Sequence, residues 1–162
     1  MTAHTTSTRF RDDGSTIYRM LDEILVVCPR CQSCARIATL TPGDRDWFAP
    51  RRLTCRHCGH ARDWAERQIA RYWGRPAVDD FFHEPLWLQT PCGNEILWAY
   101  NLKHLTLLER YVGASLREHR RGPDGGWQNS ALVNRLPRWI SSAKNRAAVL
   151  KTLQKLRGRY RE

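Results

Sequence analysis

Four cysteines in two close pairs are the residues whose types and spacing point most directly to chemistry. Two residues separate Cys28 from Cys31 and Cys55 from Cys58, and 23 residues lie between the pairs. Two residues between thiols allow both sulfurs to reach one ion from a tight turn, and two such turns supply the tetrahedral set of four thiolates that suits zinc. A closed set of four ligands leaves no position for water, so the sequence predicts one structural Zn²⁺ ion.

Neighbouring residues leave alternatives to a plain four-cysteine site. Cys34 follows Cys31 after two residues, so the first pair extends to C-x2-C-x2-C, a spacing that is also found in iron–sulfur proteins. No further cysteine spacing supports such a cluster, which favours zinc. His57 and His60 lie in and beside the second pair and could each replace a thiol, since imidazole is also a zinc ligand.

The second chemical signal is an excess of positive charge near the C-terminus. The chain carries a formal net charge of +11, and residues 117–162 hold 12 Lys and Arg against 3 Asp and Glu. A helix over this region gathers apolar residues on one side and cations on the other. Such a face can follow a phosphate backbone. The predicted contact residues are Arg138, Lys144, Lys151, Lys155 and Arg159.

The cationic face has three interpretations. The first is a contact with nucleic acid, either DNA or RNA, because no acidic residue lies between Asp124 and Glu162 to balance the charge. The second is an acidic protein that docks on the same helix. The third is a solvated surface without a partner, since every amphipathic helix needs a polar side. The sequence has no Gly-rich phosphate loop, and we expect no small-molecule substrate.

Seven tryptophans are a high number for 162 residues. Most of them lie in strand-like runs, where burial in the core is the simplest expectation. Three others are better candidates for stacking on bases, since two of them lie in loops beside Arg or Gly. These three are Trp47, Trp127 and Trp139.

Acidic and nucleophilic side chains do not form a recognisable catalytic set. Asp80, His83 and Glu84 could share a helical turn, but a nuclease would need a Lys and a strand beside them. Cys92 could pair with His83 or His104 as a nucleophile, yet nothing local would activate its thiol. The sequence therefore favours a protein that is not an enzyme, with a nuclease-like enzyme as the less favoured alternative.

Short apolar runs predict the strands that must hold the cysteines. Four of these runs flank the two cysteine pairs, and two more predict a hairpin around the turn signal Pro91–Asn94. The runs cover residues 24–27, 35–40, 51–54, 61–64, 86–89 and 95–100.

Helical spacing dominates the region after the hairpin. Asn101 is a good N-cap residue, and the apolar residues that follow it predict a long helix that ends near Arg121. A short helix is expected from Ser130 to a break at Pro137, and a last helix over residues 142–160. Three helices are therefore expected, and the last of them carries most of the predicted contact residues.

The cysteine region resembles a known class of small metal-binding domains. The segment 22–67, with its flanking strand runs, is similar to the zinc ribbons of transcription factors and of many RNA- or DNA-handling proteins. The resemblance implies a structural zinc ion, but ribbons of this class also serve as plain structural supports and as protein contacts. The matching ligands are Cys28, Cys31, Cys55 and Cys58.

The downstream region carries a second resemblance. Segments 85–92, 97–101 and 136–140 resemble a group of bacterial zinc-ribbon proteins of uncharacterised function. This resemblance implies a bacterial cytosolic protein and no particular activity.

These features together predict an α+β fold with an N-terminal zinc ribbon of short antiparallel strands, a β-hairpin and three C-terminal helices. We expect a flexible polar tail at residues 1–15, the zinc ribbon at 16–75, and the hairpin with the basic helical region at 76–162.

The composition also indicates in which compartment the protein is located and which classes of function are expected. No apolar run exceeds five residues, and the first fourteen residues lack the apolar segment of a signal peptide. Six cysteines without an export signal indicate a reducing compartment, so a cytoplasmic location without membrane contact is expected. The predicted function is non-enzymatic binding of nucleic acid, with regulation as one use, and a protein–protein adaptor is the alternative.

Overall fold

The computed structural model describes residues 8–66, 77–118 and 131–161. Its elements are named in chain order, with η for short 3-10 turns. They are β1 (Arg9–Arg11), η1 (Ile17–Met20), β2 (Glu23–Val27), β3 (Cys34–Thr39), β4 (Arg51–Thr54), β5 (Ala61–Trp64), β6 (Leu88–Cys92), β7 (Glu95–Ala99), α1 (Leu102–Gly113), β8 (Leu116–Glu118), η2 (Leu132–Arg135), α2 (Arg138–Ser141), η3 (Ala143–Asn145) and α3 (Arg146–Arg161).

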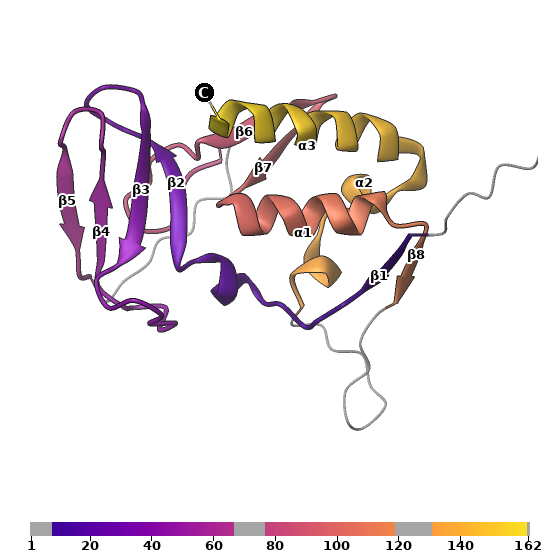
Figure 1. Cartoon of the computed structure of the whole chain (residues 1–162), viewed down its shortest axis with the longest axis horizontal. Coiled ribbons are helices and arrows are strands. Elements are labelled where there is room, and N and C mark those ends of the chain that lie inside the picture. The colour runs from indigo at the N-terminus through magenta and orange to yellow at the C-terminus, as the bar shows by residue number, and fades with distance from the viewer. Residues whose placement is uncertain (1–7, 67–76, 119–130, 162) are drawn as a thin grey trace, which may run out of the picture.

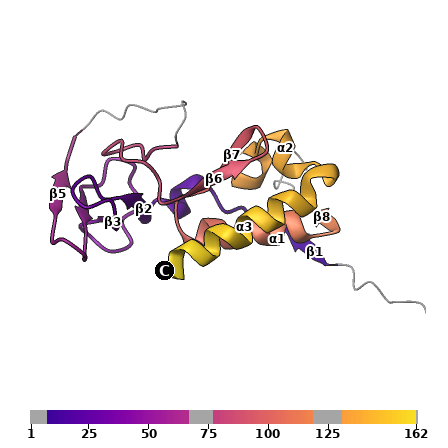
Figure 2. The ribbon, with the colours of Figure 1, turned by 90° about the horizontal axis from the view of Figure 1, so that it is seen from above.

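The molecule has a sheet at one end and helices at the other (Figure 1). An antiparallel sheet with strand order β2-β3-β4-β5 forms the first end. Helices α1 and α3 run side by side at the other end, and the hairpin β6–β7 packs against both of them. The view from above shows α3 lying across this half, with α2 on the far side of the hairpin (Figure 2). The predicted mixed α+β class, with antiparallel sheets and three helices, is confirmed within the described residues.

The four-stranded sheet places its buried side chains in register. Ile24 of β2 lies opposite Ile37 of β3, and Ile37 lies opposite Leu53 of β4. All three side chains are 0 % exposed, so this row forms the centre of the sheet's packed face. The four runs predicted around the cysteine pairs coincide with these strands to within one residue at each end.

Strand β2 joins the two halves of the chain. Along its outer edge, the Val27 N–H donates to Pro85 O at 2.8 Å and the Trp87 N–H donates to Leu25 O at 2.9 Å. The Leu25 N–H donates in turn to Tyr100 O, also at 2.8 Å. The buried apolar side chains of both halves belong to one hydrophobic core. The sheet and the helices therefore stabilise each other.

Helix α3 packs on α1 and β6 through a narrow apolar stripe. Val149, Leu153 and Leu156 are buried and recur at intervals of four and three residues. Arg157 fixes this contact through a bidentate ion pair with Glu109 of α1, with Nε–Oε1 and Nη2–Oε2 distances of 2.9 and 2.7 Å. Lys151 and Lys155 of α3 are exposed, whereas Arg146 is half-buried.

Part of the expected flexible tail is a strand. Residues Arg9–Arg11 form β1, which pairs in parallel with β8. Phe10 is only 3 % exposed, and its ring meets the Tyr111 ring edge-on with centroids 5.3 Å apart. The prediction of a tail through residue 15 is therefore wrong for β1, because one buried aromatic side chain anchors the strand to α1.

Helix α1 is shorter than predicted. It ends at Gly113, and Ala114 is already extended, whereas apolar spacing predicted a helix to about Arg121. Arg117 supplies the reason, because its Nε donates at 3.0 Å to the carbonyl of Tyr111 in the last turn. A side chain that satisfies the terminal carbonyls takes the place of further helical N–H groups.

Two other elements differ at their ends from the prediction. The hairpin turns at Gly93 and Asn94, a tighter turn than expected, because Pro91 belongs to β6. The last helix begins at Arg146 instead of Ser142, after the turn η3.

Two predicted boundaries lie outside the described residues. These are the domain boundary between residues 75 and 76 and the start of a helix at Ser130. The expected break at Pro137 is confirmed, since η2 ends at Arg135 and α2 begins at Arg138.

Asn101 connects α1 to the N-terminal half. It is 3 % exposed, and its Oδ1 accepts the His104 N–H at 2.9 Å, as expected of an N-cap. Its Nδ2 donates to Met20 O at 2.7 Å and to Glu23 O at 2.6 Å. One side chain thus satisfies three buried backbone groups on three elements.

Replacing this residue should destabilise the whole fold. We expect Asn101→Ala to lower the free energy of unfolding by about 2–4 kcal/mol, because it removes a cap and leaves two carbonyls unpaired. Urea unfolding followed by circular dichroism measures this loss. Lys103→Ala is the matched control, because its ion pair with Asp22 is largely exposed and should matter by less than about 1 kcal/mol. Equal losses in both variants would contradict this role of Asn101.

Candidate functional site

The four predicted metal ligands lie at two turns with the same backbone hydrogen bonds. In the first turn, the Cys28 N–H donates to Ser33 O and the Gln32 N–H donates to Cys28 O. In the second, the Cys55 N–H donates to the carbonyl five residues later, and the N–H four residues later donates to Cys55 O. All four bonds measure 2.8–2.9 Å. The two cysteine pairs are therefore presented by equivalent turns.

One position in each turn has a left-handed backbone. This position follows the second cysteine, with φ of 63° at Gln32 and 71° at Gly59. Glycine adopts this conformation freely, whereas a residue such as Gln32 is held there at a cost of about 1 kcal/mol or more. The surrounding structure thus imposes the same turn shape at both cysteine pairs.

The four sulfur atoms form one compact cluster. The Sγ atoms of Cys28 and Cys58 are 3.7 Å apart, those of Cys31 and Cys55 are 3.6 Å apart, and all four lie within 4.8 Å of one another. In a tetrahedral site with metal–sulfur bonds of about 2.3 Å, neighbouring sulfurs are about 3.8 Å apart. The cluster therefore has the size and the ligand number of a four-thiolate metal site.

The pKa values of the clustered thiols shift in opposite directions, because two neighbouring thiolates repel each other. Hydrogen bonding to the Ser33 backbone lowers the pKa of the Cys31 thiol to about 6. At Cys58 the His60 backbone acts in the same direction, but burial and the neighbouring thiols outweigh it and raise the pKa to about 12. A second thiolate is thus disfavoured beside the first. A divalent cation removes this penalty, because its binding displaces the thiol protons.

Other candidate ligands lie outside the cluster in the described part of the chain. The four clustered sulfurs do not include Cys34, so the C-x2-C-x2-C alternative lacks its third ligand there, and neither His57 nor His60 is a member. Burial, with a smaller contribution from Cys55, raises the pKa of Cys34 to about 11. The Sγ of Cys92 accepts a hydrogen bond at 3.5 Å from the hydroxyl of Thr152, a residue of α3.

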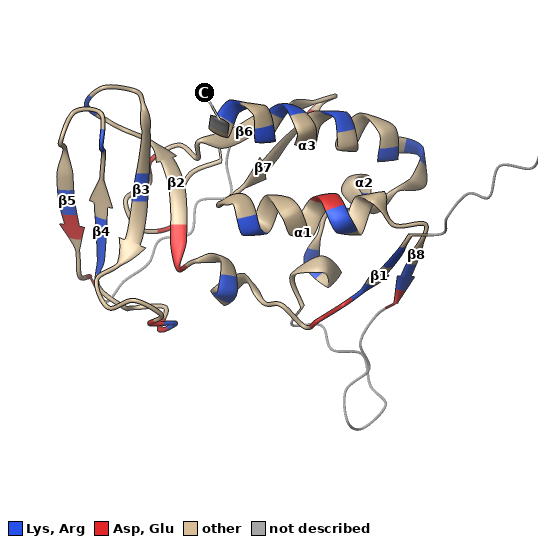
Figure 3. Cartoon of the chain, viewed as in Figure 1, with Lys and Arg blue, Asp and Glu red and all other residues tan. Residues whose placement is uncertain are grey.

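Cationic residues recur along α3 (Figure 3) and in the turn η3 before it. We call this surface the basic face, and it consists of Lys144, Lys151, Lys155 and Arg159, all exposed. No acidic residue occurs within α3. Within the described ranges, none of the three lysines forms an ion pair, in contrast to Arg157. Lys151, Lys155 and Arg159 recur at every fourth residue of α3, so helical geometry places them on the same side, whereas Lys144 lies in η3. Their role as contact residues stays a prediction.

Two of the predicted contact residues differ from the lysines. The Arg159 guanidinium lies over the Trp87 ring, 4.6 Å from its centroid, and its Nη1 is 3.5 Å from Gln89 O. This side chain therefore also joins α3 to the segment that enters β6. Arg138 is exposed at the start of α2, so it lies on a different element from the basic face.

The acidic set considered in the sequence does not form a helical turn. Asp80 accepts the Tyr100 hydroxyl at 3.2 Å, and Glu84 lies 3.7 Å from Arg62. His83 has a left-handed φ of 59°, which separates the carboxylates along a loop. The geometry brings these groups to different neighbours instead of one reaction centre.

Two of the tryptophans predicted to stack on bases line a cavity instead of an open surface. Trp47 and Trp139 are half-buried there together with Trp98, which was expected in the core. Trp127 lies outside the described residues. No local sequence signal indicates this cavity, because its walls come from segments far apart in the chain.

Comparison of the chain with protein-family models, with curated proteins and with solved structures finds no match. Among the described residues, no helix combines the length and the apolar composition needed to cross a bilayer. The cysteine cluster and the basic face are therefore the features from which a function is inferred.

Metal binding should depend on the four clustered thiols and on no other cysteine. We expect the protein to take up one equivalent of Co²⁺ with the visible absorption of a tetrahedral thiolate site, and Cys58→Ser to abolish that absorption. Optical titration of the reduced protein measures both effects.

Cys34→Ser is the control, since Cys34 is also half-buried but lies outside the cluster. It should retain the full equivalent and the tetrahedral spectrum. Loss of binding in Cys34→Ser comparable to that in Cys58→Ser would contradict the assignment of ligands.

Proposed function

We propose that this chain is a zinc-ribbon protein that is not an enzyme and binds nucleic acid through the basic face. Zinc is the metal that best fits four clustered thiolates, since it accepts tetrahedral sulfur ligands and hard cations such as Mg²⁺ do not. Cys28, Cys31, Cys55 and Cys58 would hold it with no open position. Its role is to stabilise the two turns, and its binding energy adds to the stability of the fold.

The observation that carries the nucleic-acid proposal is the basic face itself. Two exposed lysines, Lys151 and Lys155, lie on one side of the acid-free helix α3, a third, Lys144, lies in the turn η3 before it, and within the described residues none of the three has an ion pair. A surface whose only role is solvation commonly mixes both signs of charge. An unneutralised row of cations instead favours a polyanion, because each phosphate contact releases condensed counterions.

The dimensions of the face fit a phosphate backbone. From Lys151 to Arg159 the helix rises about 12 Å at about 1.5 Å per residue. Phosphates recur about every 3.4 Å along the axis of one strand, so this length spans three or four of them. The lysines supply mobile cations, whereas Arg159 is held against Trp87 and supplies a fixed one. Arg138 would extend the contact from α2.

The direct test is binding of fluorescently labelled single- and double-stranded DNA and RNA at several salt concentrations. Fluorescence anisotropy should show affinity for at least one of these classes that falls linearly on a log–log plot against salt. Absence of binding to all four at physiological salt, with capture of an acidic protein by the same helix, would replace this proposal by the adaptor function.

Charge reversal on the basic face should weaken this binding in a specific way. We expect Lys151→Glu combined with Lys155→Glu to reduce affinity at least about tenfold and to reduce the magnitude of the salt slope by about 2, one unit for each lost phosphate contact. The control is Arg19→Glu combined with Arg45→Glu, which makes the same charge change at exposed positions away from α3. Equal loss in both double variants would assign the binding to net charge instead of the basic face.

A further inference from the structure

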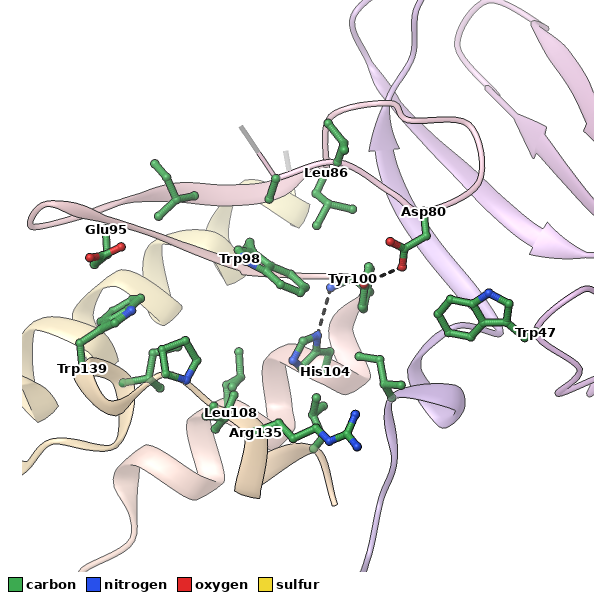
Figure 4. Close-up of a pocket in the computed structure, with 18 residues that line it drawn as sticks. Trp47, Asp80, Leu86, Glu95, Trp98, Tyr100, His104, Leu108, Arg135 and Trp139 are labelled. Atoms are coloured by element: carbon green, nitrogen blue, oxygen red, sulfur yellow. Dashed lines mark hydrogen bonds between the residues drawn. The ribbon is translucent and has the colours of Figure 1, made fainter. Parts of the chain in front are cut away.

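A cavity of about 390 Å³ lies between β7, α1 and the segment from η2 to α2 (Figure 4). Its walls are mainly apolar and aromatic, and they include Trp47, Trp98, Trp139 and Tyr100. The Trp98 ring meets the Tyr100 ring edge-on at 5.0 Å and the His104 ring edge-on at 5.6 Å. Cavities that bind small ligands share this size and this aromatic lining.

The imidazole of His104 lines the cavity, and one of its two nitrogens has no hydrogen-bond partner among the described residues. The side chain is 2 % exposed, and its Nδ1 accepts the backbone N–H of Tyr100 at 3.3 Å. Its Nε2 is buried and has no hydrogen-bond partner among the residues that the structure describes. Burial lowers the pKa of His104 to about 4, so the ring is neutral. A neutral ring that accepts at Nδ1 carries its proton on Nε2, which is therefore a donor.

Within the described part of the chain, the Nε2–H of His104 is an unpaired donor in an apolar wall, and a ligand with an acceptor atom would satisfy it. Buried polar groups almost always have a partner, because leaving one unpaired carries its full desolvation penalty. The cavity is wide enough for a bicyclic ring, and Figure 4 shows Trp98 and Trp139 on one side of His104 and Trp47 on the other. An acceptor on such a ring would satisfy Nε2, while the ring faces pack against the indoles.

Four other residues with polar side-chain groups line the cavity. Tyr100 donates its hydroxyl to Asp80 at 3.2 Å, and Arg135 and Glu95 lie on separate elements around the space. A few polar groups in a mainly apolar cavity fix the orientation of a ligand without dominating its affinity. The arrangement therefore selects by shape and by one buried donor.

We propose that this cavity binds a planar heteroaromatic molecule whose ring acceptor takes a hydrogen bond from His104 Nε2. The site is independent of the basic face, because its lining shares no residue with α3. The required chemistry occurs both in free heteroaromatic compounds and in the unpaired bases of a nucleic-acid strand.

A matched pair of probes tests the proposal. Quinoline and naphthalene have the same shape, but only quinoline carries a ring acceptor. In NMR titrations of ¹⁵N-labelled full chain, quinoline should shift the indole N–H signals of Trp98 and Trp139 and the Nε2–H signal of His104. It should bind about three- to tenfold more tightly than naphthalene, the gain of one buried hydrogen bond. Absence of quinoline binding, or equal binding of both probes, overturns the proposal.

Two variants separate the cavity from the general fold. Ile96 lines the cavity and is half-buried, so Ile96→Trp should fill the space and abolish quinoline binding. Leu40→Trp adds the same side chain at a residue that is 50 % exposed and does not line the cavity, and it should bind quinoline normally. His104→Asn keeps an acceptor for the Tyr100 N–H but is too short to place a donor at the position of Nε2, and should cancel the preference for quinoline. Unchanged quinoline binding in Ile96→Trp overturns the assignment to this cavity.

An oligonucleotide arm distinguishes the two sources of the ring. If the protein prefers a single-stranded oligonucleotide to its abasic counterpart and Ile96→Trp removes that preference, the cavity takes a base from a strand. Equal binding of the two oligonucleotides, with quinoline binding intact, assigns the cavity to a free heteroaromatic molecule.

Discussion

Convergence of four sulfur atoms from two turns is the constraint on which the N-terminal half depends. Its strands are four to six residues long, and the two turns connect them in pairs, β2 with β3 and β4 with β5. Each turn contributes one partner to both close sulfur pairs, so the hairpins β2–β3 and β4–β5 meet at this end of the sheet. The pairing of β3 with both β2 and β4 aligns Ile24, Ile37 and Leu53 in one buried row. The same convergence brings thiolates into mutual repulsion, which only a cation relieves.

The cysteine turns are linked to the helices through β2, because this strand forms hydrogen bonds with segments of both halves. The segment before β6 bonds its outer edge, Tyr100 O accepts from Leu25, and Asn101 bonds Met20 and Glu23 at the start of α1. One core continues across these contacts. The two cysteine turns thus belong to a half that shares one core with the helices, and stability gained at the cysteines is expected to support α1 and the elements that pack on it.

Local patterns predicted the parts of this fold whose causes are local. The runs beside the cysteines became β2–β5 because the turns fix where each strand begins and ends, and Asn101 capped α1 as its side chain requires. The pairing of β1 with β8 joins residues more than 100 positions apart and has no sequence signature. The early end of α1 depends on Arg117 reaching back to Tyr111. The clustering of the four cysteines was therefore predictable, whereas the cavity around His104 was not, since five or more separate segments build it.

The position of the basic face depends on contacts between α3 and the segment that packs on the four-stranded sheet. Trp87 bonds the edge of β2 through its backbone and supports the Arg159 guanidinium with its ring, so one residue touches both the sheet and α3. The Gln89 side chain stabilises the same segment, because its Nε2 donates to Ala77 O at 2.9 Å and to Leu86 O at 2.8 Å. On the helical side, Arg157 and Glu109 fix α3 against α1. Because α3 is held from both sides, Lys151 and Lys155 project from a supported helix, which would reduce the entropy lost on binding the proposed polyanion.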